Sequence, residues 1–281
     1  MKRSLSFILL IFTAFFCNSC SFSKLLKSND ADAKYEKAIE LYEHKDYSRA
    51  LQLFDQLIGT ARATDKSERI YYLYAYCYYN QKDYTMASYY FKRYATNFPN
   101  TKNAEECQYL SAYCTYLDSP DYSLDQSNST EAIKDLQLFV NNYPTSSHVP
   151  DCNDLIDKLR NKLAEKDFKL ARLYFRMDDY MAAIVSFNNI LKEYPETDYR
   201  EESLFLILKS SCKYAEKSIE SKKKERDLKA VSAYNDFMSQ YPKSKFVQEA
   251  KDLKEKVDKD LASIAAGKNT TIKKNQNKLI K

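Results

Sequence analysis

Glycine is almost missing from this chain of 281 residues, which contains only Gly59 and Gly267. Tight turns with positive φ, phosphate-cradling loops and nucleophile elbows need glycine where the backbone turns sharply or approaches a ligand. The shortage therefore argues against hairpin-rich β-sandwiches and against nucleotide-binding α/β sheets. A helical fold is what remains.

Histidine is also scarce, with only His44 and His148, and tryptophan is absent. Two histidines leave little for acid/base or zinc chemistry, and neither has a nucleophile at motif spacing. With 44% hydrophobic and 30% charged residues, the composition is typical of a globular chain. We therefore expect a protein that is not an enzyme and that has no cofactor and no metal.

The amino-terminal segment predicts secretion. A basic start is followed by an apolar run of 12 residues, Leu5–Phe16, which is shorter than the roughly 20 residues of a membrane-spanning helix. Residues 17–20 read Cys-Asn-Ser-Cys and resemble a bacterial lipobox. Cys20 is the expected lipidation site because the small Ser19 precedes it. We expect a signal peptide over residues 1–19 and a lipidated linker over 20–32; the alternative is a soluble secreted protein cut near Ser19.

Five further cysteines are widely separated in the chain: Cys77, Cys107, Cys114, Cys152 and Cys212. No Cys-x-x-Cys pair of the kind that ligates metals occurs among them. We interpret them as small buried thiols. A disulfide between repeats stays open as the alternative.

A repeated motif is the main signal of the sequence. Asp-Tyr-x-x-Ala-x-x-x-Phe begins at Asp46, Asp83 and Asp179. Ala132 with Leu136 and Ala230 with Tyr234 form two degenerate copies. Eight residues beyond the large residue, four copies place an aromatic residue before a proline: Phe98-Pro99, Tyr143-Pro144, Tyr194-Pro195 and Tyr241-Pro242.

Each copy predicts a helical hairpin. Alanine lets a neighbouring helix approach, the large residue four positions later lies on the same face, and proline ends the helix. The pattern resembles the tetratricopeptide repeat. It predicts an all-α protein, a right-handed α-solenoid of about five such hairpins over residues 33–245 with a capping helix over 246–266.

The carboxy-terminal residues 267–281 are expected to form a basic, disordered tail. The formal net charge of +5 falls to +3 when Lys2 and Arg3 leave with the signal, and the five tail lysines leave the folded part at −2. We therefore expect no nucleic-acid partner. The tail is either a solvated end or a weak contact to anionic lipid or an acidic partner.

The sequence resembles the BamD (ComL-like) lipoprotein family of the β-barrel assembly machinery. The features that carry this resemblance are the lipobox, the five long repeats, the [Phe/Tyr]-Pro-x-[Ser/Thr/Asn] repeat ends and the insertion Leu117–Gln126. The resemblance implies a lipid-anchored protein on the periplasmic face of the outer membrane. It also implies that the protein binds unfolded outer-membrane proteins and the periplasmic domains of an Omp85-type, BamA-like channel subunit. By binding both, the protein would promote the folding and insertion of barrels.

Tyrosines are expected to line the concave groove of the first three repeats. In the repeat register, the first helices turn eight of them toward the groove: Tyr35, Tyr42, Tyr72, Tyr76, Tyr79, Tyr109, Tyr113 and Tyr116. Tyrosine combines apolar area with a hydroxyl and loses little entropy on binding, which suits the capture of extended barrel segments. The alternative is that these rings pack between the repeats.

Arginines mark the fourth repeat. Arg172, Arg176 and Arg200 are the expected interface with the channel subunit, because a guanidinium forks onto partner carboxylates; a solvated or intrahelical role is the alternative. For the whole protein the alternative is a periplasmic tetratricopeptide-repeat adaptor that coordinates cell-wall synthesis and envelope constriction.

Overall fold

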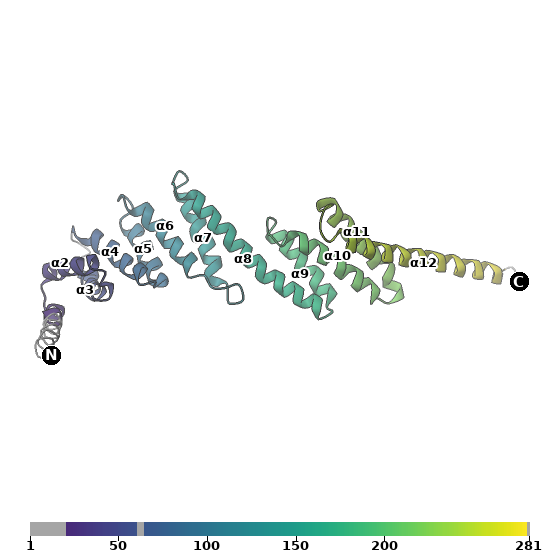
Figure 1. The fold of residues 1–281 in the computed structure, drawn as a ribbon, viewed down its shortest axis with the longest axis horizontal. Coiled ribbons are helices and arrows are strands. Elements are labelled where there is room, and N and C mark those ends of the chain that lie inside the picture. Colours follow the sequence, from purple (N-terminus) through teal and green to yellow (C-terminus); the bar gives the residue numbers. More distant parts are fainter. Residues whose placement is uncertain (1–20, 61–64, 280–281) are drawn as a thin grey trace, which may run out of the picture. The chain divides into compact units, whose positions relative to one another are not determined.

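A computed structural model describes residues 21–60 and 65–279, and all regular structure within these ranges is helical (Figure 1). A short helix over residues 21–27 precedes the hairpins. The signal peptide and Cys20 lie outside the described residues. The helices are α2 (Ala31–Glu43), α3 (Tyr47–Thr60), α4 (Ser67–Asn80), α5 (Tyr84–Asn97), α6 (Ala104–Leu117), α7 (Ser127–Asn142), α8 (Val149–Arg176), α9 (Tyr180–Glu193), α10 (Arg200–Glu216), α11 (Glu220–Gln240) and α12 (Val247–Leu279).

The helices pair in order as five hairpins, α2/α3 through α10/α11, and α12 follows them (Figure 1). The prediction of an all-α repeat protein is confirmed for the described residues. The chain divides into two compact units. The first contains residues up to Pro120 and Gln126–Ile156, and the second contains Asp121–Asp125 and all residues from Asp157 onward.

The motif alanine and its large partner form the core of the first four hairpins, whereas in the fifth Ala230 is buried and Tyr234 is half-buried. Ala50 and Phe54, Ala87 and Phe91, Ala132 and Leu136, and Ala183 and Phe187 are all fully buried. In the fourth hairpin the ring centroids of Phe168 on α8 and Phe187 on α9 lie 5.7 Å apart. Burying a phenylalanine side chain stabilises a fold by about 1.5–3 kcal/mol, so these positions fix how the two helices of a hairpin pack.

The motif aspartate begins the second helix. The side chains of Asp46, Asp83 and Asp179 each accept a hydrogen bond from the backbone N–H three residues later, at 3.1 to 3.2 Å. Such N-caps satisfy one of the N–H groups that a helix leaves unpaired at its first turn. The residue before each aspartate has positive φ: Lys45, Lys82 and Asp178, at 61° to 63°.

The prolines end the second helices as predicted. Helices α5, α7, α9 and α11 stop one residue before the aromatic of the aromatic-proline pair, and that aromatic is their C-cap. Each aromatic has φ near −130° and ψ between 53° and 68°, outside the α region that a following proline disfavours.

The boundaries expected at both ends need correction. Residues 21–27 are helical and α2 already begins at Ala31, so the expected linker over 20–32 is partly helix. Helix α12 continues to Leu279, past the expected end at residue 266 and through most of the tail that we expected to be disordered. A single Gly267 costs a helix only about 1 kcal/mol, and no proline follows it to end the helix.

All five cysteines within the described residues are free and buried, and none forms a disulfide. Burial raises the pKa of the Cys77, Cys114 and Cys212 thiols to about 12. These thiols therefore stay protonated and unreactive at neutral pH. The interpretation as buried apolar side chains is confirmed.

Candidate functional site

Seven tyrosines on the first helices of the first unit form the set that we call the tyrosine face. Its members are half-buried and come from the first helices of three hairpins: Tyr42 of α2, Tyr72, Tyr76 and Tyr79 of α4, and Tyr109, Tyr113 and Tyr116 of α6. On α4 and α6 they recur at spacings of three and four residues, which place side chains on one side of a helix.

The rings of the tyrosine face contact one another along each helix. On α4 the centroids of Tyr72 and Tyr76 lie 4.8 Å apart, and those of Tyr76 and Tyr79 lie 6.2 Å apart. On α6 the rings of Tyr109, Tyr113 and Tyr116 stack at 5.8 and 6.0 Å. Stacked α6 rings present their remaining faces and edges for further aromatic contacts.

Glu106 of α6 fixes two of the α4 rings. The hydroxyls of Tyr72 and Tyr76 donate to its two carboxylate oxygens at 3.1 and 2.6 Å. By contrast, the hydroxyls of Tyr79, Tyr109, Tyr113 and Tyr116 bond to no described residue. The α6 end of the tyrosine face therefore offers polar groups that a ligand can use, whereas Tyr72 and Tyr76 are committed to the fold.

His148 closes the α6 end of the face. Its imidazole stacks on Tyr109 with 4.0 Å between the ring centroids. This contact could not be predicted from the sequence, because 39 positions separate the two residues and only the packing of α6 against the segment after α7 joins them. Burial raises the pKa of Tyr109 and Tyr42 to about 12, so both hydroxyls remain hydrogen-bond donors at neutral pH.

Tyr35 does not belong to the face, contrary to our expectation. Only 8% of its surface is exposed, and it packs with Leu41 and Leu53 in the core of the first hairpins. Phe22, Leu25 and Leu26 of the short helix over 21–27 pack on the same core. This contact was not readable from the repeat register, because the register assigns no helix before the first hairpin.

The three predicted arginines lie in the second unit and differ in the contacts that their guanidinium groups make within the protein. Arg172 and Arg176 lie one turn apart on the exposed side of α8. Arg172 places its guanidinium 5.8 Å from the ring centre of Phe168 and 3.8 Å from the carboxylate of Glu202. Arg200 is tied internally, donating to the carbonyl of Pro195 and the amide oxygen of Gln240 at 3.1 and 3.0 Å.

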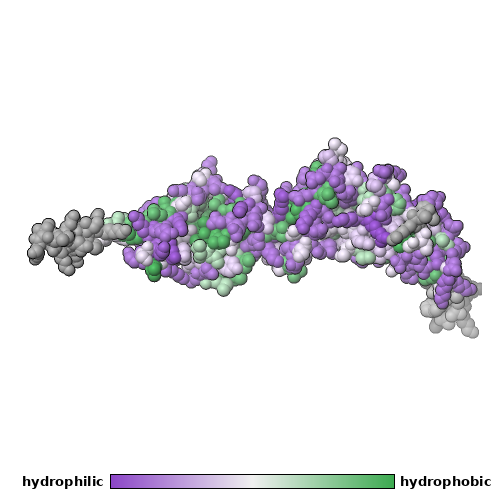
Figure 2. Space-filling view, turned by 180° about the vertical axis from the view of Figure 1, so that it is seen from behind, coloured by the Kyte–Doolittle hydropathy of each residue, from purple (hydrophilic) through white to green (hydrophobic). Residues whose placement is uncertain are grey.

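Exposed apolar side chains adjoin the α8 arginines, a feature that the sequence analysis missed. Leu170, Leu173 and Met177 follow one another at spacings of three and four residues and are 46%, 41% and 67% exposed. Figure 2 shows that apolar patches lie between hydrophilic regions on one face of the molecule. The exposed side of α8 is thus apolar along one edge and basic along the other.

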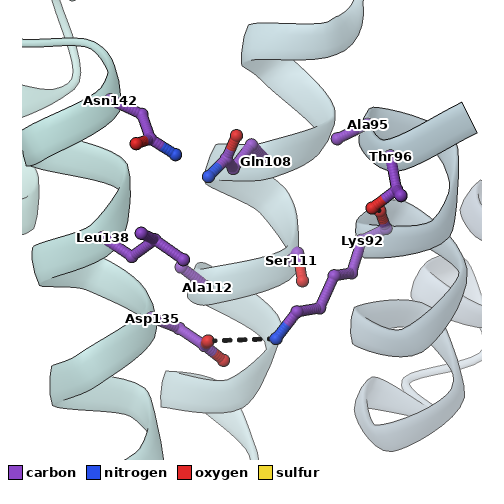
Figure 3. Close-up of a pocket in the computed structure, with 9 residues that line it drawn as sticks. All are labelled: Lys92, Ala95, Thr96, Gln108, Ser111, Ala112, Asp135, Leu138 and Asn142. Atoms are coloured by element: carbon purple, nitrogen blue, oxygen red, sulfur yellow. Dashed lines mark hydrogen bonds and ion pairs between the residues drawn. The ribbon is translucent and has the colours of Figure 1, made fainter. Parts of the chain in front are cut away.

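A hollow of about 300 Å³ lies elsewhere on the first unit, between α5, α6 and α7 (Figure 3). The lysine and the carboxylate in its lining, Lys92 and Asp135, form an ion pair at 3.4 Å. Because these charges neutralise each other and no aromatic ring lines the hollow, its lining offers little to a charged ligand or an aromatic peptide.

The described part of the chain contains no cluster of three or more histidine, cysteine or acidic side chains able to hold a metal ion. None of the described helices is both long and apolar enough to cross a bilayer.

Comparison with known protein families shows which family the chain belongs to. A family model described as "Outer membrane lipoprotein", YfiO, matches residues 27–228, more than two thirds of the chain. The chain belongs to this family. Membership in the YfiO family confirms the resemblance drawn from the repeats, and the match spans α2–α10 and part of α11, including the tyrosine face and all three arginines.

Three curated relatives of this YfiO-family chain carry the name "Outer membrane protein assembly factor BamD". The protein of Caulobacter vibrioides is 27% identical over 90 residues, covering 32% of this chain and 30% of the relative. That of Buchnera aphidicola is 30% identical over 103 residues, covering 37% and 41%. That of Vibrio cholerae is 32% identical over 79 residues, covering 28% and 33%. The chain thus aligns with about a third to two fifths of their length.

A crystal structure of a TPR repeats protein from Bacteroides fragilis is also similar to this chain. It has 14% sequence identity and a TM-score of 0.41, and the similarity covers 82% of this chain and 99% of that protein.

Proposed function

We propose that the chain is a non-enzymatic lipoprotein for outer-membrane protein assembly, anchored through Cys20 on the periplasmic side of the outer membrane. The tyrosine face of its first unit binds unfolded outer-membrane proteins, and Arg172, Arg176 and Arg200 of its second unit dock the periplasmic domains of an Omp85-type channel subunit. Family membership and the three assembly-factor relatives support this role.

The tyrosine face is the observation that carries the substrate-binding part. An unfolded barrel strand alternates apolar or aromatic side chains with polar ones and has unpaired backbone N–H and C=O groups. Half-buried tyrosine rings offer apolar area at small entropic cost, and their hydroxyls can bond to a backbone. The stacked Tyr109, Tyr113 and Tyr116, whose hydroxyls bond to no described residue, are suited to both contacts.

Replacement of Tyr113 and Tyr116 together by alanine tests this proposal. We choose these two because Tyr72 and Tyr76 hold Glu106, and Tyr109 holds His148. Loss of two aromatic contacts should weaken binding of a fluorescent peptide from a barrel strand by about tenfold or more, measured by anisotropy. Circular dichroism should show an unchanged helix content.

Two control variants distinguish the contribution of the aromatic rings to peptide affinity from that of the hydroxyls and from the effect of changing any exposed tyrosine. The variant with Tyr113→Phe and Tyr116→Phe keeps the apolar area and should lose only a small part of the affinity. Tyr89→Ala removes an exposed tyrosine from α5, outside the tyrosine face, and should leave the affinity unchanged. If Y113A/Y116A binds the peptide as tightly as the natural protein, the tyrosine face is not the substrate site.

A further inference from the structure

A cavity of about 480 Å³ lies in the second unit, where the loop end of the α10/α11 hairpin meets α12. It shares no residue with the tyrosine face or with the three arginines. Binding there is therefore independent of the proposed assembly function, and its failure would leave that function untouched.

Asp227 of α11 forms part of the cavity wall and is 1% exposed. Its Oδ2 atom is buried and accepts no hydrogen bond from any residue that the structure describes. Leaving a buried polar atom without a partner costs about 1–3 kcal/mol, and more for a charged group. Burial accordingly raises the pKa of this carboxyl, opposed by the ammonium of Lys223 and assisted by the carboxylate of Asp260.

The neighbouring cations do not neutralise Asp227, because most of them are engaged. Lys223 lies one turn before Asp227 on α11, but its ammonium is paired with Asp260 of α12 at 2.5 Å. Lys213 of α10 is paired with Glu216 at 3.0 Å. Lys256 of α12 is exposed at the cavity and opposes the entry of a cation. Asp227 is thus a hydrogen-bond acceptor of the cavity wall for which no described residue supplies a donor to Oδ2.

The remaining wall is apolar. Leu253 and Val257 of α12 and the thiol of Cys212 contribute to it, and Val257 and Cys212 are buried. A ligand that fits this lining has a donor-bearing positive head for Asp227 and an aliphatic stem for the apolar wall. Primary amines and guanidinium groups on alkyl chains have this form.

We propose that the cavity binds a cationic head on an aliphatic stem, either a lysine or arginine side chain of a partner polypeptide or a free aliphatic amine, with the carboxylate of Asp227 as the hydrogen-bond acceptor. The head would supply the donor that Asp227 lacks, and the stem would cover Leu253 and Val257.

Methyl NMR of the full chain in detergent tests this proposal. Leu253 and Val257 report on the cavity, and Leu53, fully buried in the first unit, is the reference methyl. The probes are N-acetyl-lysine methylamide, N-acetyl-arginine methylamide and 1,5-diaminopentane. Saturable shifts of the Leu253 and Val257 methyls, with Leu53 unchanged, are the expected result. Tighter binding of the amino-acid probes indicates a partner polypeptide, and tighter binding of the diamine indicates a free amine.

The charge dependence distinguishes a cation site from an apolar pocket. N-acetyl-norleucine methylamide has the lysine stem without the amine and should produce no saturable shift. Asp227→Asn keeps the shape and removes the charge, and it should weaken binding of the lysine probe at least tenfold. Lys256→Gln removes the opposing cation and should tighten binding two- to threefold.

Three results would overturn the proposal: no saturable shift with any cationic probe, equal binding of the norleucine probe, or unchanged binding of the lysine probe by D227N. If D227N does not fold, K256Q decides the matter, because a K256Q protein that binds the lysine probe no more tightly than the natural chain excludes a cation site.

Discussion

At the residue scale, the three motif copies share a turn that is built without glycine. Lys45, Lys82 and Asp178 adopt a left-handed conformation immediately before the capping aspartate. This conformation places Cβ close to the following carbonyl oxygen and costs an L-residue about 1–2 kcal/mol. Aspartate capping and the buried alanine and phenylalanine that follow offset this strain in each copy.

Replacement of Lys82 by glycine should therefore stabilise the protein. The side chain of Lys82 is exposed and forms no hydrogen bond, ion pair or ring contact with any described residue. Relief of the backbone strain, less the greater freedom of glycine in the unfolded chain, should raise the free energy of unfolding by about 0.5–1 kcal/mol in urea denaturation.

The matched control places glycine where the backbone is helical. Gln137→Gly in the exposed interior of α7 should lower the free energy of unfolding by up to about 1 kcal/mol, because glycine gains nothing at negative φ. A loss of stability in K82G as large as that in Q137G would show that the turn at Lys82 is not strained.

At the element scale, α8 has an exposed side with two chemical characters. Leu170 and Leu173, with Met177 just after the helix, form its apolar edge, and Arg172 and Arg176 form its basic edge. A partner surface with acidic groups beside apolar side chains would complement both edges. Such complementarity sets the specificity and the rate of association more than the affinity.

Charge reversal on α8 tests the proposed docking of the channel subunit. The double substitution of Arg172 and Arg176 by glutamate exchanges attraction for repulsion, and should abolish co-purification of an Omp85-type channel with the tagged chain from membranes. Arg200 is left in place because its substitution would also remove the hydrogen bonds to Pro195 and Gln240, so a lost complex would not report on docking alone.

Lys192→Glu on the exposed side of α9 is the control, since it reverses one charge in the same unit away from the arginines. It should leave the complex intact. Recovery of the channel with R172E/R176E would contradict the assigned interface, and recovery of cell-wall synthases in place of any channel would favour the adaptor role instead.

At the scale of the whole molecule, the proposed function needs the chain to be held at a membrane. Lipidation at Cys20 is the predicted means, because acyl chains contribute about 0.8 kcal/mol per buried methylene group and two or more chains anchor a protein stably. Cys20 lies outside the described residues, so this part of the proposal depends on the sequence.

Cys20→Ala should prevent acylation. We expect that the C20A chain incorporates no labelled palmitate and that it is no longer recovered in the outer-membrane fraction after cell fractionation. Cys17→Ala is the matched control and should remain labelled and membrane-bound, because the large Phe16 precedes Cys17 where a lipobox needs a small residue. Labelling that is lost with C17A and kept with C20A would reassign the anchor to Cys17.

Much of the fold could be predicted because the repeat determines it locally. The spacing of alanine to phenylalanine places both side chains on one face of a helix, and the aromatic-proline pairs end the helices where predicted. The limits of α12 could not be predicted in this way. A lysine-rich segment without proline is compatible with helix as well as with disorder, and α12 continues through it to Leu279.

The sequence by itself determined that the chain is helical, where four of the hairpins end, and which tyrosines share a helix face, because these properties depend on residues within a few turns of one another. Only the tertiary structure decided that Tyr35 is buried, that Glu106 binds Tyr72 and Tyr76, and that His148 stacks on Tyr109. It alone revealed the unpaired Asp227 as well. Whether a side chain of given helical phase meets a neighbour or a cavity depends on helices distant in sequence, which local periodicity does not specify.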